Sequence, residues 1–81
     1  MRVYLVIDSG GYEGNNATLI PGICSTIDKA KEIFSKRVDD VKYDIDENWE
    51  FEETETSFYA SEIGRCSRNW IHIWIEESEV I

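Results

Sequence analysis

The sequence predicts an α+β fold, a two-layer sandwich in which one helix, at about residues 26–40, packs on a mainly antiparallel sheet of three to four strands. Three observations support this. One stretch places apolar residues at helical spacing, several short runs have the composition or alternation of strands, and no repeat or linker interrupts the chain. The 81 residues are enough for a single domain, residues 1–81, with a small core.

The N-terminal run "RVYLVI" (residues 2–7) is apolar, rich in β-branched residues and bounded by "DSGG". This composition predicts a strand in the middle of the sheet, buried on both faces. The following "ATLIPGI" (residues 17–23) predicts a short second strand. Because Pro21 and Gly22 interrupt it, we expect an edge strand or a bent connection.

The stretch "CSTIDKAKEIFSKRVDD" predicts the only helix. Ser25 is the expected N-cap, with Asp28 three residues later in a capping-box pattern that also suits the positive end of the helix dipole. Apolar residues recur at spacings of three and four and form one stripe. The stripe consists of Ile27, Ala30, Ile33 or Phe34, Val38 and Val41.

In the stretch "NWEFEETETSFYASEI" apolar and acidic residues alternate, with Trp49 and Phe51 on one side and Glu50 and Glu52 on the other. The period shifts at residues 54–57, which indicates a hairpin turn or a bulge. The turn-rich "IGRCSRN" then predicts a loop before the last strand.

The closing stretch "WIHIWIEESEV" shows the most regular alternation in the chain. It places Trp70, His72 and Trp74 on one face and Ile71, Ile73 and Ile75 on the other. Since one helix covers one face of a sheet, we expect the isoleucine face to pack on the helix and the tryptophan face to point away, with Trp49 or Tyr59 beside it. An uncovered aromatic patch is typical of an interface. Cover by loops, a homodimer and another partner remain open.

The glycine-rich stretch "VIDSGGYEGNN" follows a predicted strand, as phosphate-binding loops do. However, the loop has no lysine, the helix begins some ten residues later, and Asp8 and Glu13 would repel phosphate. We therefore expect its glycines to supply positive φ angles in a hairpin or wide loop. Tyr12 and Glu13 at the tip are candidates for partner contact.

The net charge of −9 lies entirely in residues 39–62, which carry ten acidic residues and one basic residue. Such a surface repels nucleic acid and lipid headgroups and favours a protein partner with a basic surface. The candidate acidic residues for partner binding are Asp39, Asp40, Asp44, Asp46, Glu47, Glu50, Glu52, Glu53 and Glu55. Solubility alone is the other explanation of this charge.

No pattern points to a metal, a cofactor or a catalytic group. Some acidic residues have the spacing of the ligands in a calcium-binding loop. However, Trp49 occupies the sixth position of that loop, where glycine is required, and no helices are predicted on either side. His72, the only histidine, lies near Cys66 without an orienting third group, so a packing role is expected. Cys24 and Cys66 are expected to be reduced structural thiols.

The order of "VYLVIDSGGYEG", "ICSTIDKAKEIF" and "WIHIWIEESEV" resembles small uncharacterised β-α-β-β proteins of bacteria and their phages, a domain of unknown function. The resemblance spans most of the chain. It implies the same fold, no catalytic residue, and an accessory or host-directed role in a phage or mobile-element context. We expect a cytoplasmic location, because the apolar runs are too short for a membrane span or a signal peptide.

These observations lead to the hypothesis of a non-catalytic, acidic protein-binding module without direct nucleic-acid or membrane contact. In its most specific form it inhibits a basic nucleic-acid-binding host protein by DNA mimicry, as some anti-CRISPR proteins of similar size and charge do. A protein that sequesters a small molecule or an ion, and a structural homodimer, are the alternatives.

Overall fold

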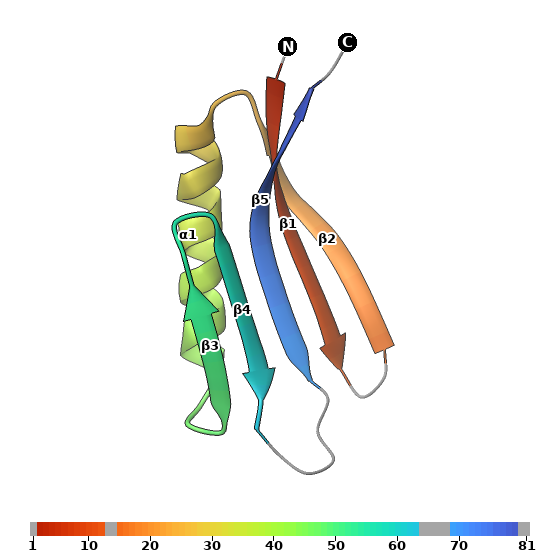
Figure 1. Cartoon of the computed structure of the whole chain (residues 1–81), viewed down its shortest axis with the longest axis vertical. Coiled ribbons are helices and arrows are strands. Elements are labelled where there is room, and N and C mark those ends of the chain that lie inside the picture. Colours follow the sequence, from red (N-terminus) through yellow and green to blue (C-terminus); the bar gives the residue numbers. More distant parts are fainter. Residues whose placement is uncertain (1, 13–14, 64–68, 80–81) are drawn as a thin grey trace.

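The computed structural model of the chain describes residues 2–12, 15–63 and 69–79. Within them, one helix packs on a sheet of five antiparallel strands (Figure 1). The elements are β1 (Arg2–Tyr12), β2 (Asn15–Cys24), α1 (Ile27–Asp44), β3 (Trp49–Glu53), β4 (Ser57–Glu62) and β5 (Trp70–Glu79). The strand order is β2-β1-β5-β4-β3, so β5 joins two hairpins. The α+β class is confirmed, and the sheet has five strands instead of three to four.

β2 accounts for part of this difference, because it is a ten-residue edge strand that continues through Pro21. Val6 of β1 pairs with Gly22, but Asp8 pairs with Leu19, so the register shifts beside the proline. A β-bulge of this kind accommodates an extra residue without ending the strand, and an edge strand tolerates a proline. The expected edge position is confirmed, and the expected interruption is wrong.

The glycines of the "DSGG" segment also differ from expectation. Gly10 and Gly11 lie within β1 instead of in a loop, and neither has a positive φ. Gly14 lies outside the described residues.

The helix begins one residue later than expected, and Thr26, not Ser25, is its N-cap. The Thr26 Oγ1 atom accepts a hydrogen bond from the Lys29 N–H at 3.3 Å. Asp28 lies in the first turn, where its charge suits the helix dipole. At the C-terminal end of the helix, the Ile45 N–H donates a hydrogen bond to the Val41 carbonyl oxygen at 3.0 Å. No helix among the described residues is both long and apolar enough to cross a membrane.

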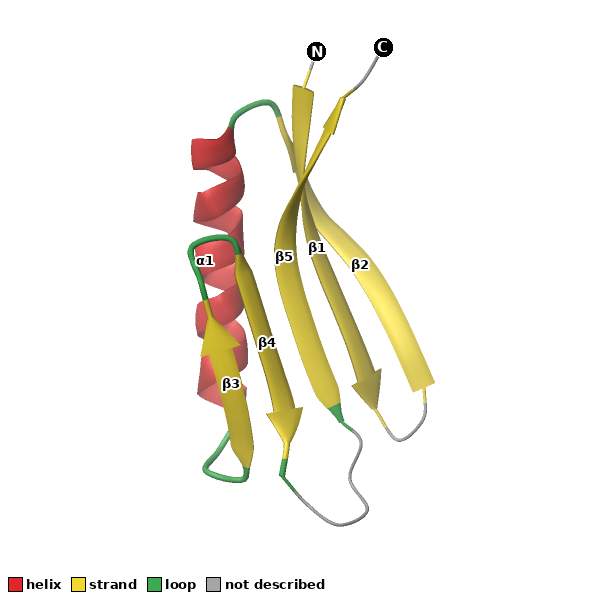
Figure 2. Ribbon diagram, in the orientation of Figure 1, coloured by secondary structure: helices red, strands yellow, loops and turns green. Residues whose placement is uncertain are grey.

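The hydrophobic core lies between α1 and one face of the sheet, and Figure 2 shows α1 on that side only. Its buried members from the helix are Ala30, Phe34 and Val38, which belong to the predicted stripe, with Phe34 as the buried one of the Ile33 and Phe34 alternatives. The sheet contributes Val6, Cys24, Phe58, Ala60 and Ile73, with Ile71 and Ile75 packed against them. The prediction that the isoleucine face of the last strand packs on the helix is therefore confirmed.

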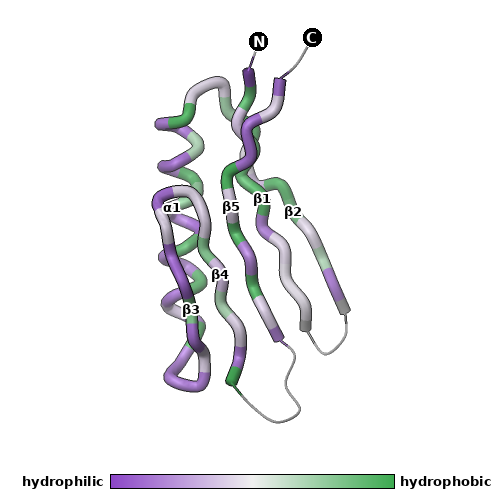
Figure 3. Tube along the Cα trace, in the orientation of Figure 1, coloured by the Kyte–Doolittle hydropathy of each residue, from purple (hydrophilic) through white to green (hydrophobic). Residues whose placement is uncertain are grey.

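The β3–β4 hairpin explains the shift of period near residue 55. The Thr54 N–H donates to the Ser57 carbonyl oxygen at 2.8 Å, and the Thr54 Oγ1 atom accepts from the Ser57 N–H at 3.0 Å. Figure 3 shows that β3 is mainly hydrophilic, whereas β5 alternates.

Candidate functional site: the face of the sheet opposite the helix

The face of the sheet opposite α1 carries no helix or strand of the described chain. We call it the open face. The residues of the open face alternate along each strand with the core residues. The pairing registers show that they all lie on the same side of the sheet. They are Ile7, Ser9 and Gly11 of β1, Trp70, His72 and Trp74 of β5, Ser57, Tyr59 and Ser61 of β4, and Glu50 and Glu52 of β3.

Three aromatic rings form a row across the open face. The His72 ring lies 4.4 Å from the Trp74 ring between centroids, at an interplanar angle of 31°. On its other side the Tyr59 ring meets His72 edge-on, at 5.6 Å and 74°. Both geometries are favourable for aromatic pairs. The predicted tryptophan face therefore exists, and His72 is one of its packed members.

The β5 aromatic residues are half-buried, and Tyr59 is 46% exposed. Ile7, paired with Trp74 on the neighbouring strand, is only 8% exposed although no described helix or strand lies over it. Val6 beside it is fully buried on the helix side, so β1 is buried on both faces at this point, as predicted. The aromatic row thus forms a packed surface and not a set of free side chains.

Gly11 leaves space for the Trp70 ring, a relationship that was not predicted. The two residues pair across β1 and β5. A Cβ atom on Gly11 would lie 2.9 Å from the Trp70 Cδ1 atom and 2.8 Å from the Asn16 Oδ1 atom, so a side chain at this position would have to displace these groups. Glycine within a strand often marks such a close approach, and this was the available signal.

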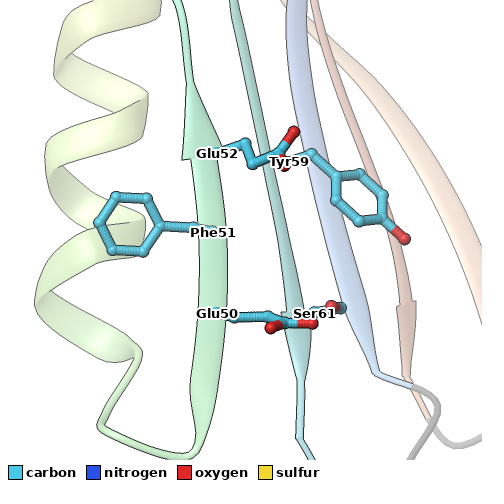
Figure 4. Close-up of a pocket in the computed structure, with 5 residues that line it drawn as sticks. All are labelled: Glu50, Phe51, Glu52, Tyr59 and Ser61. Carbon is cyan, nitrogen blue, oxygen red and sulfur yellow. The ribbon is translucent and has the colours of Figure 1, made fainter.

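Glu50 and Glu52 border the aromatic row on β3. Glu52 pairs with Tyr59, and Glu50 pairs with Ser61. Together with Phe51 these residues line a shallow hollow of about 330 Å³. In Figure 4 the two glutamates and Tyr59 point to one side of the hairpin, whereas Phe51 points the other way, toward α1.

Neither glutamate forms an ion pair with any residue that the structure describes. Their neighbours on the same hairpin do: Glu53 binds Lys42 at 2.6 Å and Glu55 lies 3.7 Å from Lys31. Among the described residues, no basic side chain therefore neutralises the two carboxylates on the open face.

The other predicted acidic residues do not share this face. Asp39, Asp40 and Asp44 lie exposed on α1. Asp46 and Glu47 lie in the connection to β3, where the Asp46 Oδ1 atom accepts a hydrogen bond from the Asn48 N–H at 2.8 Å. Among the described residues, no three or more histidine, cysteine or acidic side chains are grouped so that they would hold a metal ion. The acidic segment therefore spans several surfaces.

The remaining candidates either lie on another side of the sheet than expected or fall outside the described residues. Of the two residues expected beside the tryptophan face, Tyr59 lies there, whereas Trp49 lies on the helix side of the sheet and packs against the core, so its expected place is wrong. The odd residues of β3 share the side of Phe58 and Ala60, and this parity explains its position. The Tyr12 side chain, Glu13 and Cys66 lie outside the described residues, and Cys24 is a buried free thiol.

Comparison with known proteins found no protein-family model, no curated protein and no solved structure that matches this chain. The function is therefore argued from the open face itself.

Proposed function

We propose that this protein is a non-catalytic binding module that holds a basic protein partner on its open face. The observation that carries the proposal is the joint placement of an aromatic row and two glutamates on a face that no described helix or strand covers. Neither glutamate has an ion-pair partner among the described residues. Each feature alone is common on protein surfaces. Together they match what an arginine- or lysine-rich surface needs.

The aromatic row supplies the area that binding removes from water. Tyrosine and tryptophan dominate the energetic centres of protein interfaces, because they bury a large surface and lose little conformational freedom. Here the rings are already packed against one another, so little ordering is required when a partner binds.

The carboxylates supply orientation and charge. A guanidinium or ammonium group that stacks on the Tyr59 ring lies beside Glu52, and Glu50 lies two residues along the same strand. Cation–π contacts and charge-assisted hydrogen bonds reinforce each other in such a site. The exposed acidic residues of α1, Asp39 and Asp40, lie away from the open face, so their long-range field acts on the rate of encounter with a basic surface more than on the affinity.

We extend the proposal to the class of partner. A basic surface that meets fixed carboxylates in place of phosphates is typical of nucleic-acid-binding proteins, so the partner class that fits best is a host protein of this kind, which binding would inhibit in the cytoplasm.

The test is capture of partners from a nuclease-treated bacterial lysate on the immobilised full chain, read by mass spectrometry, followed by affinity measurement with the purified partner. Glu50→Gln/Glu52→Gln removes two charges from the open face. Asp39→Asn/Asp40→Asn removes two charges from α1 and serves as the matched control. Tyr59→Ala and Tyr43→Ala form a second matched pair, because Tyr43 is 91% exposed on the helix.

The proposal requires that a basic partner loses at least tenfold in affinity with Glu50→Gln/Glu52→Gln and with Tyr59→Ala. It also requires that the two control variants bind within about threefold of the native chain. A partner that binds all four variants equally would exclude the open face as the binding surface. A partner without nucleic-acid-binding activity would refute the extension and leave the binding module in place.

A further inference from the structure

The two edges of the sheet are built differently. β3 forms one edge with five residues, three of which are glutamates. β2 forms the opposite edge with ten residues, and none of them is charged. Natural sheets usually protect their edges with charges, short strands or covering segments, because an unpaired strand can pair with another chain. β3 has this protection, and the first half of β2 does not.

The exposed half of β2 is Asn16–Ile20. Every residue in this range is exposed, and both alternating sides of the strand include apolar side chains. Leu19 is 61% exposed and Ile20 is 53% exposed. Threonine, leucine and isoleucine favour strand pairing. This segment therefore combines an edge that no other described strand pairs with side chains that suit a neighbouring strand.

The helix does not cover this half of the edge. α1 meets β2 near Gly22, where a Cβ atom would lie 2.7 Å from the Ile33 Cδ1 atom. In Figure 1 the other end of β2 extends away from α1 beside the end of β1. Pro21 and the β-bulge lie between the two halves and limit new pairing to Asn16–Ile20.

We propose that this edge binds a second copy of the same chain, through antiparallel pairing of Asn16–Ile20 with its counterpart. The distribution of charge favours a second copy as the partner, because the β2 edge carries no charge that would repel it. Since the net charge of −9 lies in residues 39–62, which include β3, two chains that meet at β2 place their acidic edges at opposite ends of the joint sheet. Pairing of identical strands is also closed by a two-fold axis, so it ends at a dimer.

The symmetry has a direct geometric result. A two-fold axis that relates antiparallel neighbouring strands stands perpendicular to the sheet, so both helices lie on one side of a ten-stranded sheet. Both open faces then lie on the other side. The dimer would present two copies of the open face in one direction, but the pairing itself does not depend on what that face binds.

The experiment measures the mass of the full chain by sedimentation over a wide concentration range. Leu19→Lys/Ile20→Lys places like charges across the proposed two-fold axis. Tyr43→Lys/Ile63→Lys is the matched control, because it adds the same two charges at exposed apolar positions, 91% and 57% exposed, away from β2. Both variants therefore change the net charge equally. Circular dichroism and thermal unfolding confirm that each variant is folded.

We expect a native mass of twice 9.4 kDa, an unchanged dimer in the control, and at least a tenfold weaker dimer in the edge variant. A native chain that stays monomeric at all concentrations would overturn the proposal. So would a dimer that the edge variant forms as well as the control does, since the contact would then lie on another surface. Partner binding by a monomeric edge variant is a separate measurement, so failure of the open face would not affect this result.

Discussion

Gly11 of β1 faces Trp70 of β5 across the open face, and the indole ring fills the space that a side chain at position 11 would need. We predict that Gly11→Val displaces this ring and destabilises the fold by about 1–3 kcal/mol, the usual range for overpacking. The measurement is urea unfolding together with tryptophan fluorescence. The fluorescence change should disappear in a Trp70→Phe background. Ala17→Val, on the exposed neighbouring strand, is the control and should cost less than about 0.5 kcal/mol.

Phe58 and Phe51 lie on paired strands with ring centroids 5.5 Å apart, but only Phe58 is fully buried. We predict that Phe58→Ala costs about 3–5 kcal/mol, because it leaves a cavity in the core. Phe51 is 50% exposed, so Phe51→Ala should cost about 1 kcal/mol. Chemical denaturation of both variants tests this, and equal losses would contradict the assignment of the core.

The helix N-cap offers a comparison of two adjacent residues. Thr26 accepts the hydrogen bond from the Lys29 N–H, and Ser25 does not cap the helix. We predict that Thr26→Ala lowers the free energy of unfolding by about 1 kcal/mol and that Ser25→Ala changes it by only a few tenths. Thermal unfolding distinguishes the two. A larger effect at Ser25 would mean that the helix begins one residue earlier.

Arg37 and Asp8 form an ion pair between α1 and β1, with the aspartate side chain only 13% exposed. We predict that Asp8→Asn costs about 1–2 kcal/mol, more than an exposed pair and less than a fully buried one. Glu77→Gln, which breaks the exposed pair with Arg2, is the control and should cost less than about 0.5 kcal/mol. A double-mutant cycle with Arg37→Met isolates the coupling, and zero coupling would contradict a role for the pair in stability.

The helix and the last strand were predictable because their patterns depend on local periodicity alone. The spacing of Ala30, Phe34 and Val38 specifies one buried stripe. The alternation of isoleucines with Trp70, His72 and Trp74 specifies which side of the last strand meets this stripe. The cap was placed one residue early because Ser25 and Thr26 are both good capping residues. Only the backbone angles at position 26 decide between them.

The extent of β2 and the membership of the open face were not predictable in the same way. Pro21 predicts the end of a strand when only the sequence is considered. In the structure, a shift in the register between β1 and β2 accommodates the proline within the strand. The total of acidic residues does not tell which of them share a face. Glu50 and Glu52 join Tyr59 because the turn at Thr54 sets the pairing of β3 with β4. Trp49 lies on the opposite side for the same reason.

The central place of β5 also determines when the fold can form. The β1–β2 and β3–β4 hairpins join residues that are near each other in sequence, but β5 pairs with β1 from nearly the far end of the chain, as in Arg2 with Glu79. Such long-range pairing slows folding, because a long loop must close first. During synthesis the two hairpins therefore stay apart, and their inner edges remain open, until the residues up to Glu79 have left the ribosome. The sheet therefore becomes continuous only when β5, the last of the described elements to be synthesised, has paired with both hairpins.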